Sequence, residues 1–150
     1  MILLSIDPGA TSGTALFFDG SLAWSWHGPI SAAFPVALPH ITQVVIEKPR
    51  HYPHSSKSDP KTGRVHHVDP NTLITLAVNV GQWVERVRML YGVTATTVLP
   101  QDWKRQLSKK IAHDRIHGVL TPAERAHWPT DHNARDAIGI GLHALGRWRV

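Results

Sequence analysis

The chain has 150 residues, of which 42% are hydrophobic, and its 16 Lys and Arg against 11 Asp and Glu give a net charge of +5. This length predicts one domain over residues 1–150 with a sizeable core, and the basic balance favours a polyanionic partner. The sequence has no cysteine, which excludes a disulfide framework and a thiolate zinc site, and no apolar run approaches the ~20 residues of a membrane span, so we expect an intracellular protein without a membrane segment.

The first half of the chain is predicted to consist mainly of β-strands. Apolar and β-branched runs bounded by turn residues predict strands at residues 2–6, 13–18, 22–26 and 44–47. Asp19-Gly20 is a typical two-residue hairpin turn between the second strand and the third. The Pro-rich segment 29–39 is a candidate for a short helix, and residues 48–68 are predicted to form a loop.

The second half is predicted to contain helices around one further strand, at residues 93–99. Asp69-Pro70 predicts the start of a central helix, which Gly92 ends. Shorter helical segments are predicted at residues 101–107 and 109–127, with breaks near Gly118 and Pro122. The last helix is predicted from Ala134, with a buried stripe formed by Ala137, Ile138, Gly141, Ala144 and Leu145. Gly139 and Gly141 would let this helix approach a sheet closely.

Two of the predicted strands end in a carboxylate. Asp7 ends the first strand before Pro8-Gly9, and Glu47 ends the fourth before Lys48-Pro49. If these strands are parallel neighbours, the two carboxylates lie side by side, and a divalent cation would relieve their repulsion. The alternative interpretation is structural, with Asp7 capping a turn and Glu47 as a surface charge.

A third acidic position lies at the start of the last helix. Asp136 stands beside its apolar stripe, and His132, four residues earlier, shares the face of Asp136 if the helix begins early enough. Asp131 is better placed as the N-cap. A polar cluster of this kind can also serve helix capping alone.

The order of these elements, with acids ending the first and fourth strands and another on the last helix, resembles the ribonuclease H-like superfamily. Within it, the chain is most similar to the RuvC family of Holliday junction resolvases, including phage members. The motifs that carry this resemblance are Asp7-Pro8-Gly9, Val45-Ile46-Glu47, the helix from Asn71 to Gly81, and Asp136-Ala137-Ile138. It implies an α/β fold, with a mixed five-stranded sheet of antiparallel strands 1–3 and parallel strands 4–5 flanked by helices.

The resemblance also implies the site residues. Asp7, Glu47 and Asp136 match three of the four metal ligands of the family and are the expected catalytic residues. The fourth ligand normally lies three residues before the last Asp, where this chain has Asn133, and His132 is one position away. Either could complete the site, and we prefer His132 as the fourth catalytic residue for its helical spacing. The implied cofactor is Mg²⁺ or Mn²⁺, two ions per site, with no small-molecule cofactor.

The loop after the fourth strand is rich in basic residues and contains one acid, Asp59. Phosphate contacts are the natural interpretation of such a loop, and a solvated loop or a zinc site formed by its histidines is the alternative. Tyr52 resembles the aromatic residue that, in the family, wedges into the junction centre. The predicted DNA-binding residues are Lys48, Arg50, Tyr52, Lys57, Lys61, Arg64, Lys104, Lys109 and Lys110.

As a whole, the resemblance implies a structure-selective endodeoxyribonuclease that makes paired symmetric nicks in four-way branched DNA. It further implies a homodimer, with the helix over residues 71–91 at the interface, in the cytoplasm of a bacterial or phage-infected bacterial cell. Two alternatives remain open. One is another ribonuclease H-like nuclease, which acts on other branched DNA or on RNA–DNA hybrids, and the other is a catalytically weak junction-binding protein.

Overall fold

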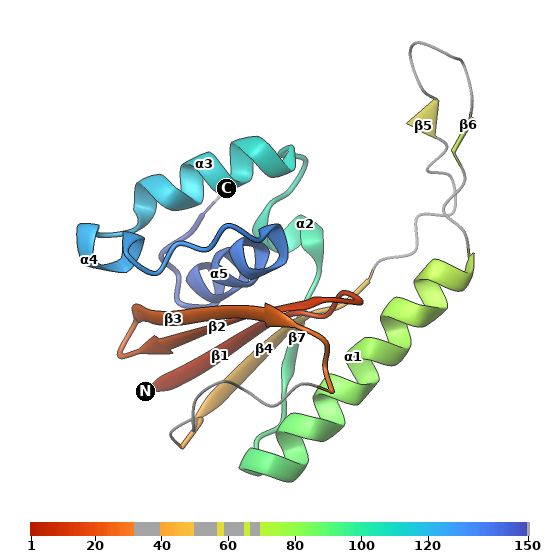
Figure 1. Ribbon diagram of the computed structural model, residues 1–150, viewed down its shortest axis with the longest axis horizontal. Coiled ribbons are helices and arrows are strands. Elements are labelled where there is room, and N and C mark those ends of the chain that lie inside the picture. The colour runs from red at the N-terminus through yellow and green to blue at the C-terminus, as the bar shows by residue number, and fades with distance from the viewer. Residues whose placement is uncertain (32–39, 50–56, 59–64, 67–69, 150) are drawn as a thin grey trace.

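The computed structural model describes residues 1–31, 40–49, 57–58, 65–66 and 70–149 (Figure 1). Its strands are β1 (Ile2–Asp7), β2 (Ser12–Phe18), β3 (Ser21–Gly28), β4 (Gln43–Glu47), β5 (Lys57–Ser58), β6 (Val65–His66) and β7 (Thr96–Val98). Its helices are α1 (Pro70–Tyr91), α2 (Pro100–Trp103), α3 (Lys109–Val119), α4 (Pro122–Arg125) and α5 (His132–Ala144). No helix in these ranges is long and apolar enough to cross a membrane.

The centre of the molecule is a five-stranded sheet in the order β3-β2-β1-β4-β7. β1, β2 and β3 pair antiparallel, whereas β4 runs parallel to β1 and β7 runs parallel to β4. Asp19 and Gly20 both have positive φ, 46° and 85°, as the hairpin turn between β2 and β3 requires. The mixed sheet with three antiparallel and two parallel strands confirms the predicted fold class.

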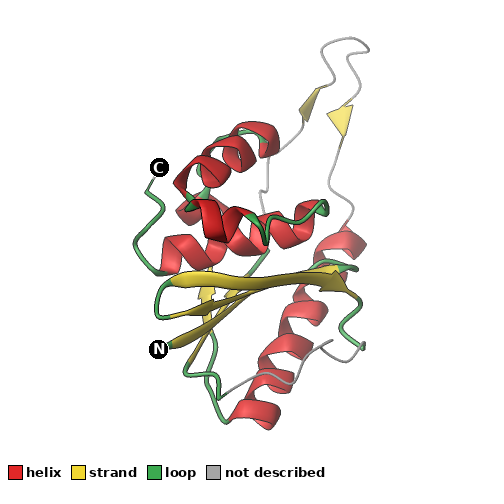
Figure 2. Ribbon diagram, turned by 60° about the vertical axis from the view of Figure 1, so that its left-hand side comes forward, coloured by secondary structure: helices red, strands yellow, loops and turns green. Residues whose placement is uncertain are grey.

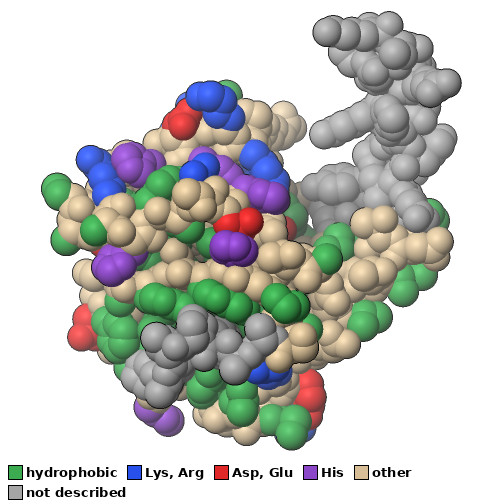
Figure 3. All heavy atoms as spheres, in the orientation of Figure 1, with side chains coloured by type: hydrophobic (Ala, Val, Ile, Leu, Met, Phe, Trp, Pro, Cys, Tyr) green, Lys and Arg blue, Asp and Glu red, His purple; other side chains and the backbone are tan. Residues whose placement is uncertain are grey.

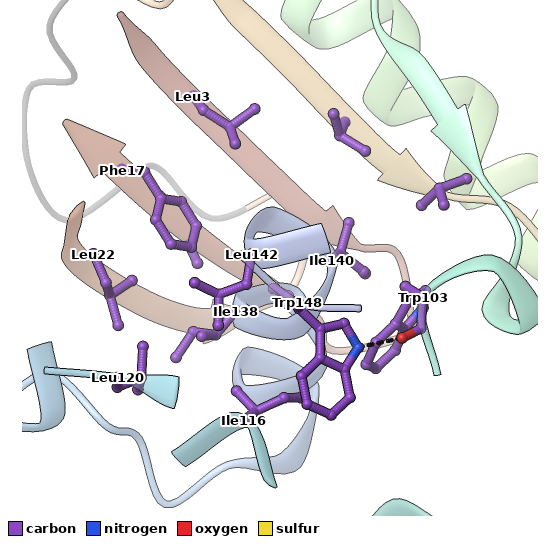
Figure 4. Close-up of a cluster of buried hydrophobic side chains, with 14 residues drawn as sticks. Leu3, Phe17, Leu22, Trp103, Ile116, Leu120, Ile138, Ile140, Leu142 and Trp148 are labelled. Atoms are coloured by element: carbon purple, nitrogen blue, oxygen red, sulfur yellow. Dashed lines mark hydrogen bonds between the residues drawn. The ribbon is translucent and has the colours of Figure 1, made fainter. Parts of the chain in front are cut away.

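Helices cover both faces of this sheet (Figures 1 and 2). α1 packs on one face, and α5 packs on the other, with α2, α3 and α4 beyond it. β1 supplies both cores, because alternate side chains of a strand point to opposite faces: Leu3 joins the cluster with α5, and Leu4 joins the cluster with α1. Figure 4 shows the first cluster, which includes Leu3 of β1, Phe17 of β2 and Ile140 of α5.

α5 lies unusually close to the sheet because small residues line the contact. A Cβ at Gly13 of β2 would lie 2.0 Å from the carbonyl oxygen of Asn133, and one at Gly141 would lie 2.2 Å from the ring of Phe17. Both distances are far below van der Waals contact, so only glycine fits. The predicted close approach to the sheet is therefore confirmed for Gly141, whereas Gly139 packs on Trp103 of α2 and Ile116 of α3 and not on the sheet. Of the predicted buried stripe, Ala144 is exposed, because it lies in the last turn, where the helix ends.

Several predicted boundaries differ from the structure. The strand predicted at residues 93–99 is shorter in the structure and covers only β7, Thr96–Val98. Only three residues of β4, Val45–Glu47, pair with it. The helix predicted at 101–107 is the shorter α2, which a turn with Arg105 at φ 47° follows. Within the predicted loop 48–68, β5 and β6 form a short antiparallel ladder, so that prediction is wrong for those strands. The short helix considered within 29–39 lies mainly outside the described residues.

Candidate active site

Two of the three predicted acids meet where β1 and β4 end. The parallel register pairs Ile6 with Ile46, so the next residue of each strand, Asp7 and Glu47, leaves the sheet at the same edge. These two residues line one small pocket with Pro8. The third acid, Asp136, is carried there by α5, and its charge raises the pKa of both strand-end carboxyls. The fold therefore brings together the three carboxylates that the sequence selected.

Asp136 is the most enclosed of the three acids, with a side chain only 3% exposed. Lys109 Nζ lies 3.0 Å from its Oδ2, and His113 Nε2 lies 2.7 Å from its Oδ1. Burial opposes ionisation of Asp136, but the hydrogen bond to His113 and the positive charges of Lys104 and Lys109 together hold its pKa below the ordinary value. Asp136 is therefore a fixed negative charge at neutral pH.

Glu47 is held by a ring nitrogen and faces one lysine. Trp103 Nε1 donates a hydrogen bond to Glu47 Oε2 at 2.5 Å. Lys104 Nζ lies 3.9 Å from Glu47 Oε2 and also 3.9 Å from Asp136 Oδ2, at the same distance from both acids. Burial still raises the pKa of Glu47, because the charge of Lys104 and the bond from Trp103 offset it only in part.

Asp7 has the strongest perturbation in the cluster. Burial raises its pKa to about 8, with further contributions from the charges of Glu47 and Asp136. No basic side chain among the described residues lies within ion-pair distance of Asp7. The charges of Lys104 and Lys109 lower the pKa of Asp7 only in part, and strongly perturbed groups of this kind are common at functional sites.

The two candidates for the fourth ligand occupy different positions at the start of α5. Asp131 is the N-cap, as predicted, and its carboxylate accepts hydrogen bonds from the amides of Asn133 and Ala134. His132 is the first helical residue and is exposed. Asn133 Nδ2 donates to the carbonyl of Thr11 at 2.7 Å, which ties α5 to the loop that follows Asp7. Asn133 therefore lies beside that loop, whereas no contact fixes the side chain of His132 within the described chain.

The donor chemistry of this edge fits a divalent cation. Carboxylate oxygens are the ligands that Mg²⁺ and Mn²⁺ prefer. Burial, together with the charge of Asp136, raises the pKa of both Asp7 and Glu47, and a bound cation would favour their ionised forms. No group of three or more His, Asp or Glu side chains is arranged to hold a metal ion in the part of the chain described here. Lys104 Nζ lies 3.9 Å from carboxylate oxygens of both Glu47 and Asp136. Its ammonium group would therefore compete with a metal ion for these two carboxylates.

The predicted DNA-binding residues fall into three groups. Lys104 and Lys109 belong to the acid cluster itself, and Lys109 remains 54% exposed. Lys48 is exposed and directly follows Glu47 in the chain. Lys110 is exposed on α3, where its Nζ lies 2.8 Å from Asp114 Oδ2. Lys57 is in β5, and the remaining candidates lie outside the described residues: Arg50, Tyr52, Lys61 and Arg64.

Two residues in contact with the acids were not singled out for this role by the sequence. Trp103 is fully buried in the core, and it also binds Glu47. His113 was not considered, although its place between Ala112 and Ile116 on the buried face of α3 would have marked it as an enclosed polar group. An enclosed histidine needs a hydrogen-bond partner, and Asp136 provides it.

Comparison with known proteins adds two solved structures. No protein-family model matches the chain, and no curated protein matches it. The structure of T. thermophilus RuvC in complex with a Holliday junction substrate aligns with a TM-score of 0.62 and 17% identity, over 99% of each chain. The chain has the RuvC-like, ribonuclease H-like fold. A second Thermus thermophilus RuvC structure aligns with a TM-score of 0.56 and 16% identity, again over 99% of both chains. The likeness in fold that the sequence motifs implied is thus confirmed.

Proposed function

We propose that this protein is a Holliday junction resolvase, a metal-dependent endodeoxyribonuclease that makes paired symmetric nicks in four-way DNA junctions. The observation that carries the proposal is the cluster of Asp7, Glu47 and Asp136 at one edge of a RuvC-like fold, with Lys104 and Lys109 beside it. The likeness to a RuvC structure that contains a Holliday junction substrate supports the choice of DNA over other polyanions.

The residues of the cluster have distinct roles in this proposal. Asp7, Glu47 and Asp136, completed by His132 or Asn133, would hold Mg²⁺ or Mn²⁺. When bound, these ions supply Lewis-acid activation of the scissile phosphate and of the attacking water. Lys109 contributes, after His113 and Lys104, to the low pKa of Asp136, and its half-exposed ammonium group is placed to contact a phosphate oxygen of the bound strand.

The surface supports a polyanionic partner. Lys, Arg and His side chains gather on the face over α3, α4 and α5 (Figure 3). Lys110 on this side is 86% exposed, and the whole chain carries a net charge of +5. Contacts from such a surface to the DNA backbone contribute affinity without sequence selectivity.

A homodimer would match the two-fold symmetry of a junction, since two symmetric nicks need two equivalent sites. α1 carries several exposed large apolar side chains, and these support it as the interface. They are Ile74, Val78, Met89 and Leu90, with exposures of 61%, 52%, 74% and 57%. Light scattering at micromolar protein should give twice the monomer mass, and a monomer mass would contradict this part of the proposal.

The decisive test is cleavage of a labelled four-way junction with Mg²⁺ or Mn²⁺, beside a plain duplex and an RNA–DNA hybrid. We expect paired nicks on opposing arms, lost with EDTA and in Glu47→Gln, while Glu47→Gln still binds the junction in a gel-shift assay. Cleavage of the hybrid alone would assign the protein to another ribonuclease H-like activity. Tight junction binding without any cleavage would identify a binding protein, and Glu47→Gln cutting at the wild-type rate would refute the site.

A further inference from the structure

We propose that Trp103 is a positioning residue for metal binding, because its indole N–H fixes the carboxylate of Glu47 in a ligating orientation. This inference rests on the proposed function and assigns a role to a side chain of the core. Trp103 Nε1 donates to Glu47 Oε2 at 2.5 Å, and the tryptophan is 0% exposed. Glu47 Oε1 has no hydrogen-bond partner among the described residues, so one oxygen is anchored and the other remains for a ligand.

The indole is held so firmly that it can act as an anchor. Its ring packs on Gly139 of α5, where a Cβ would lie 2.5 Å from the ring atom Cζ3. The backbone carbonyl of Trp103 accepts a hydrogen bond from the indole of Trp148, drawn as a dashed line in Figure 4. The turn before it is fixed by Asp102, whose Oδ2 accepts from the amide of Leu99 at 2.9 Å. The position of the Trp103 N–H is therefore set by the core.

A buried indole needs an acceptor, but a core offers many backbone carbonyls for that purpose, as Trp148 illustrates. Trp103 instead bonds to a carboxylate of the acid cluster, and such charge-assisted hydrogen bonds are shorter and stronger than neutral ones. The indole carries no charge, so it orients Glu47 without neutralising it. Lys104, whose Nζ lies 4.6 Å from the centre of the Trp103 ring, can compensate the charge of Glu47 but competes with a cation for the same space.

A hydrogen-bond donor to a metal-ligating carboxylate fixes the orientation of that ligand, and its removal typically weakens metal binding on the order of 10- to 100-fold. The competing explanation is that Trp103 only fills the core. The chain offers a control, because Trp83 is 1% exposed and also donates an indole N–H, but to the hydroxyl oxygen of Ser12. Phenylalanine at either position removes one N–H and part of a ring.

The experiment measures binding of Mn²⁺ alone to the full chain by isothermal titration calorimetry, without DNA. We expect Trp103→Phe to raise the dissociation constant at least tenfold and Trp83→Phe to change it less than twofold, although both lower the urea midpoint. Junction cleavage by Trp103→Phe should recover at high Mn²⁺ concentration, which a damaged fold would not do. Equal Mn²⁺ affinity of Trp103→Phe and wild type would overturn the inference, and so would equal losses in both variants.

A second variant keeps the test valid if Trp103→Phe does not fold. Benzothienylalanine at position 103 keeps the shape of the bicyclic ring and replaces the N–H by sulfur, so packing is preserved while the donor is lost. The same tenfold loss of Mn²⁺ affinity is expected, and unchanged affinity would refute the role of the N–H. Wild type that binds no Mn²⁺ would refute the proposed function, and the inference with it, whereas wild-type binding with an unaffected Trp103 variant would refute the inference alone.

Discussion

Replacing Glu124 with glutamine should destabilise the fold by about 3 kcal/mol at neutral pH. Glu124 is 3% exposed and receives Arg147 Nη1 at 2.5 Å and Nη2 at 2.8 Å. It also accepts from the amides of Leu22 and Thr121, both at 2.8 Å. The bond from Arg147, with those from the amides, lowers the pKa of Glu124 from 4.5 to about 2. At about 1.4 kcal/mol per pKa unit, this difference amounts to about 3 kcal/mol of stability.

The pH dependence identifies the origin of this energy. Because the folded pKa lies below the unfolded one, the contribution is fully present above pH 4.5 and is lost as pH falls from about 5 to about 2. Urea unfolding of wild type and Glu124→Gln should therefore differ by about 3 kcal/mol at pH 7 and converge near pH 2. A difference that does not change with pH would refute the reasoning. Glu85→Gln is the control, because its pair with Arg88 is exposed and should leave the unfolding midpoint unchanged.

Three further predictions concern the site and the helix that carries it. Burial and neighbouring acids raise the pKa of Asp7 to about 8, so a bound cation must displace the proton of this carboxyl. The apparent Mn²⁺ affinity should therefore rise with pH up to about 8. An Mn²⁺ affinity that stays constant from pH 6 to 9 would contradict this. Lys109→Ala should weaken junction binding in fluorescence anisotropy and lower the slope of log K against log salt by about 1, whereas an unchanged slope would argue against a phosphate contact. Gly139→Ala should lower the free energy of unfolding by about 1–3 kcal/mol, because the added methyl group overpacks the core. Gly118→Ala in α3 has nothing within 4 Å of the added Cβ and should raise the free energy of unfolding by up to about 1 kcal/mol. Equal effects of the two substitutions would contradict the argument from packing.

Local sequence signals predicted most of what positions the acids. The apolar runs before Asp7 and Glu47 ended in carboxylates, with proline one residue after Asp7 and two residues after Glu47, and both strands have those acids at their ends. Asp131 was recognisable as an N-cap because a side-chain acceptor before a helical run is a local feature. The glycines of α5 also predicted its close packing, since the absence of a side chain is visible without a structure.

The surroundings of the acids could not be predicted in the same way, because they depend on contacts between distant parts of the chain. Trp103 and Glu47 are 56 residues apart, and His113 and Asp136 are 23 apart. Which ring nitrogen meets which carboxylate depends on how α2 and α3 pack on α5, and no local pattern encodes that. Lys104 was expected to face DNA, yet its ammonium group lies equally close to Glu47 and Asp136.

The burial of α5 determines how unfolding of the protein affects the carboxylate cluster. Of the nine residues from Ala134 to Leu142, all but Arg135 are buried. We therefore expect the amides of this helix to exchange with solvent only in the most cooperative opening of the molecule. Asp136 lies within this buried segment, whereas the far side of α1 carries exposed side chains. Partial fraying of the periphery would thus leave the carboxylate geometry in place, and heating should inactivate the protein in a single step that coincides with global unfolding.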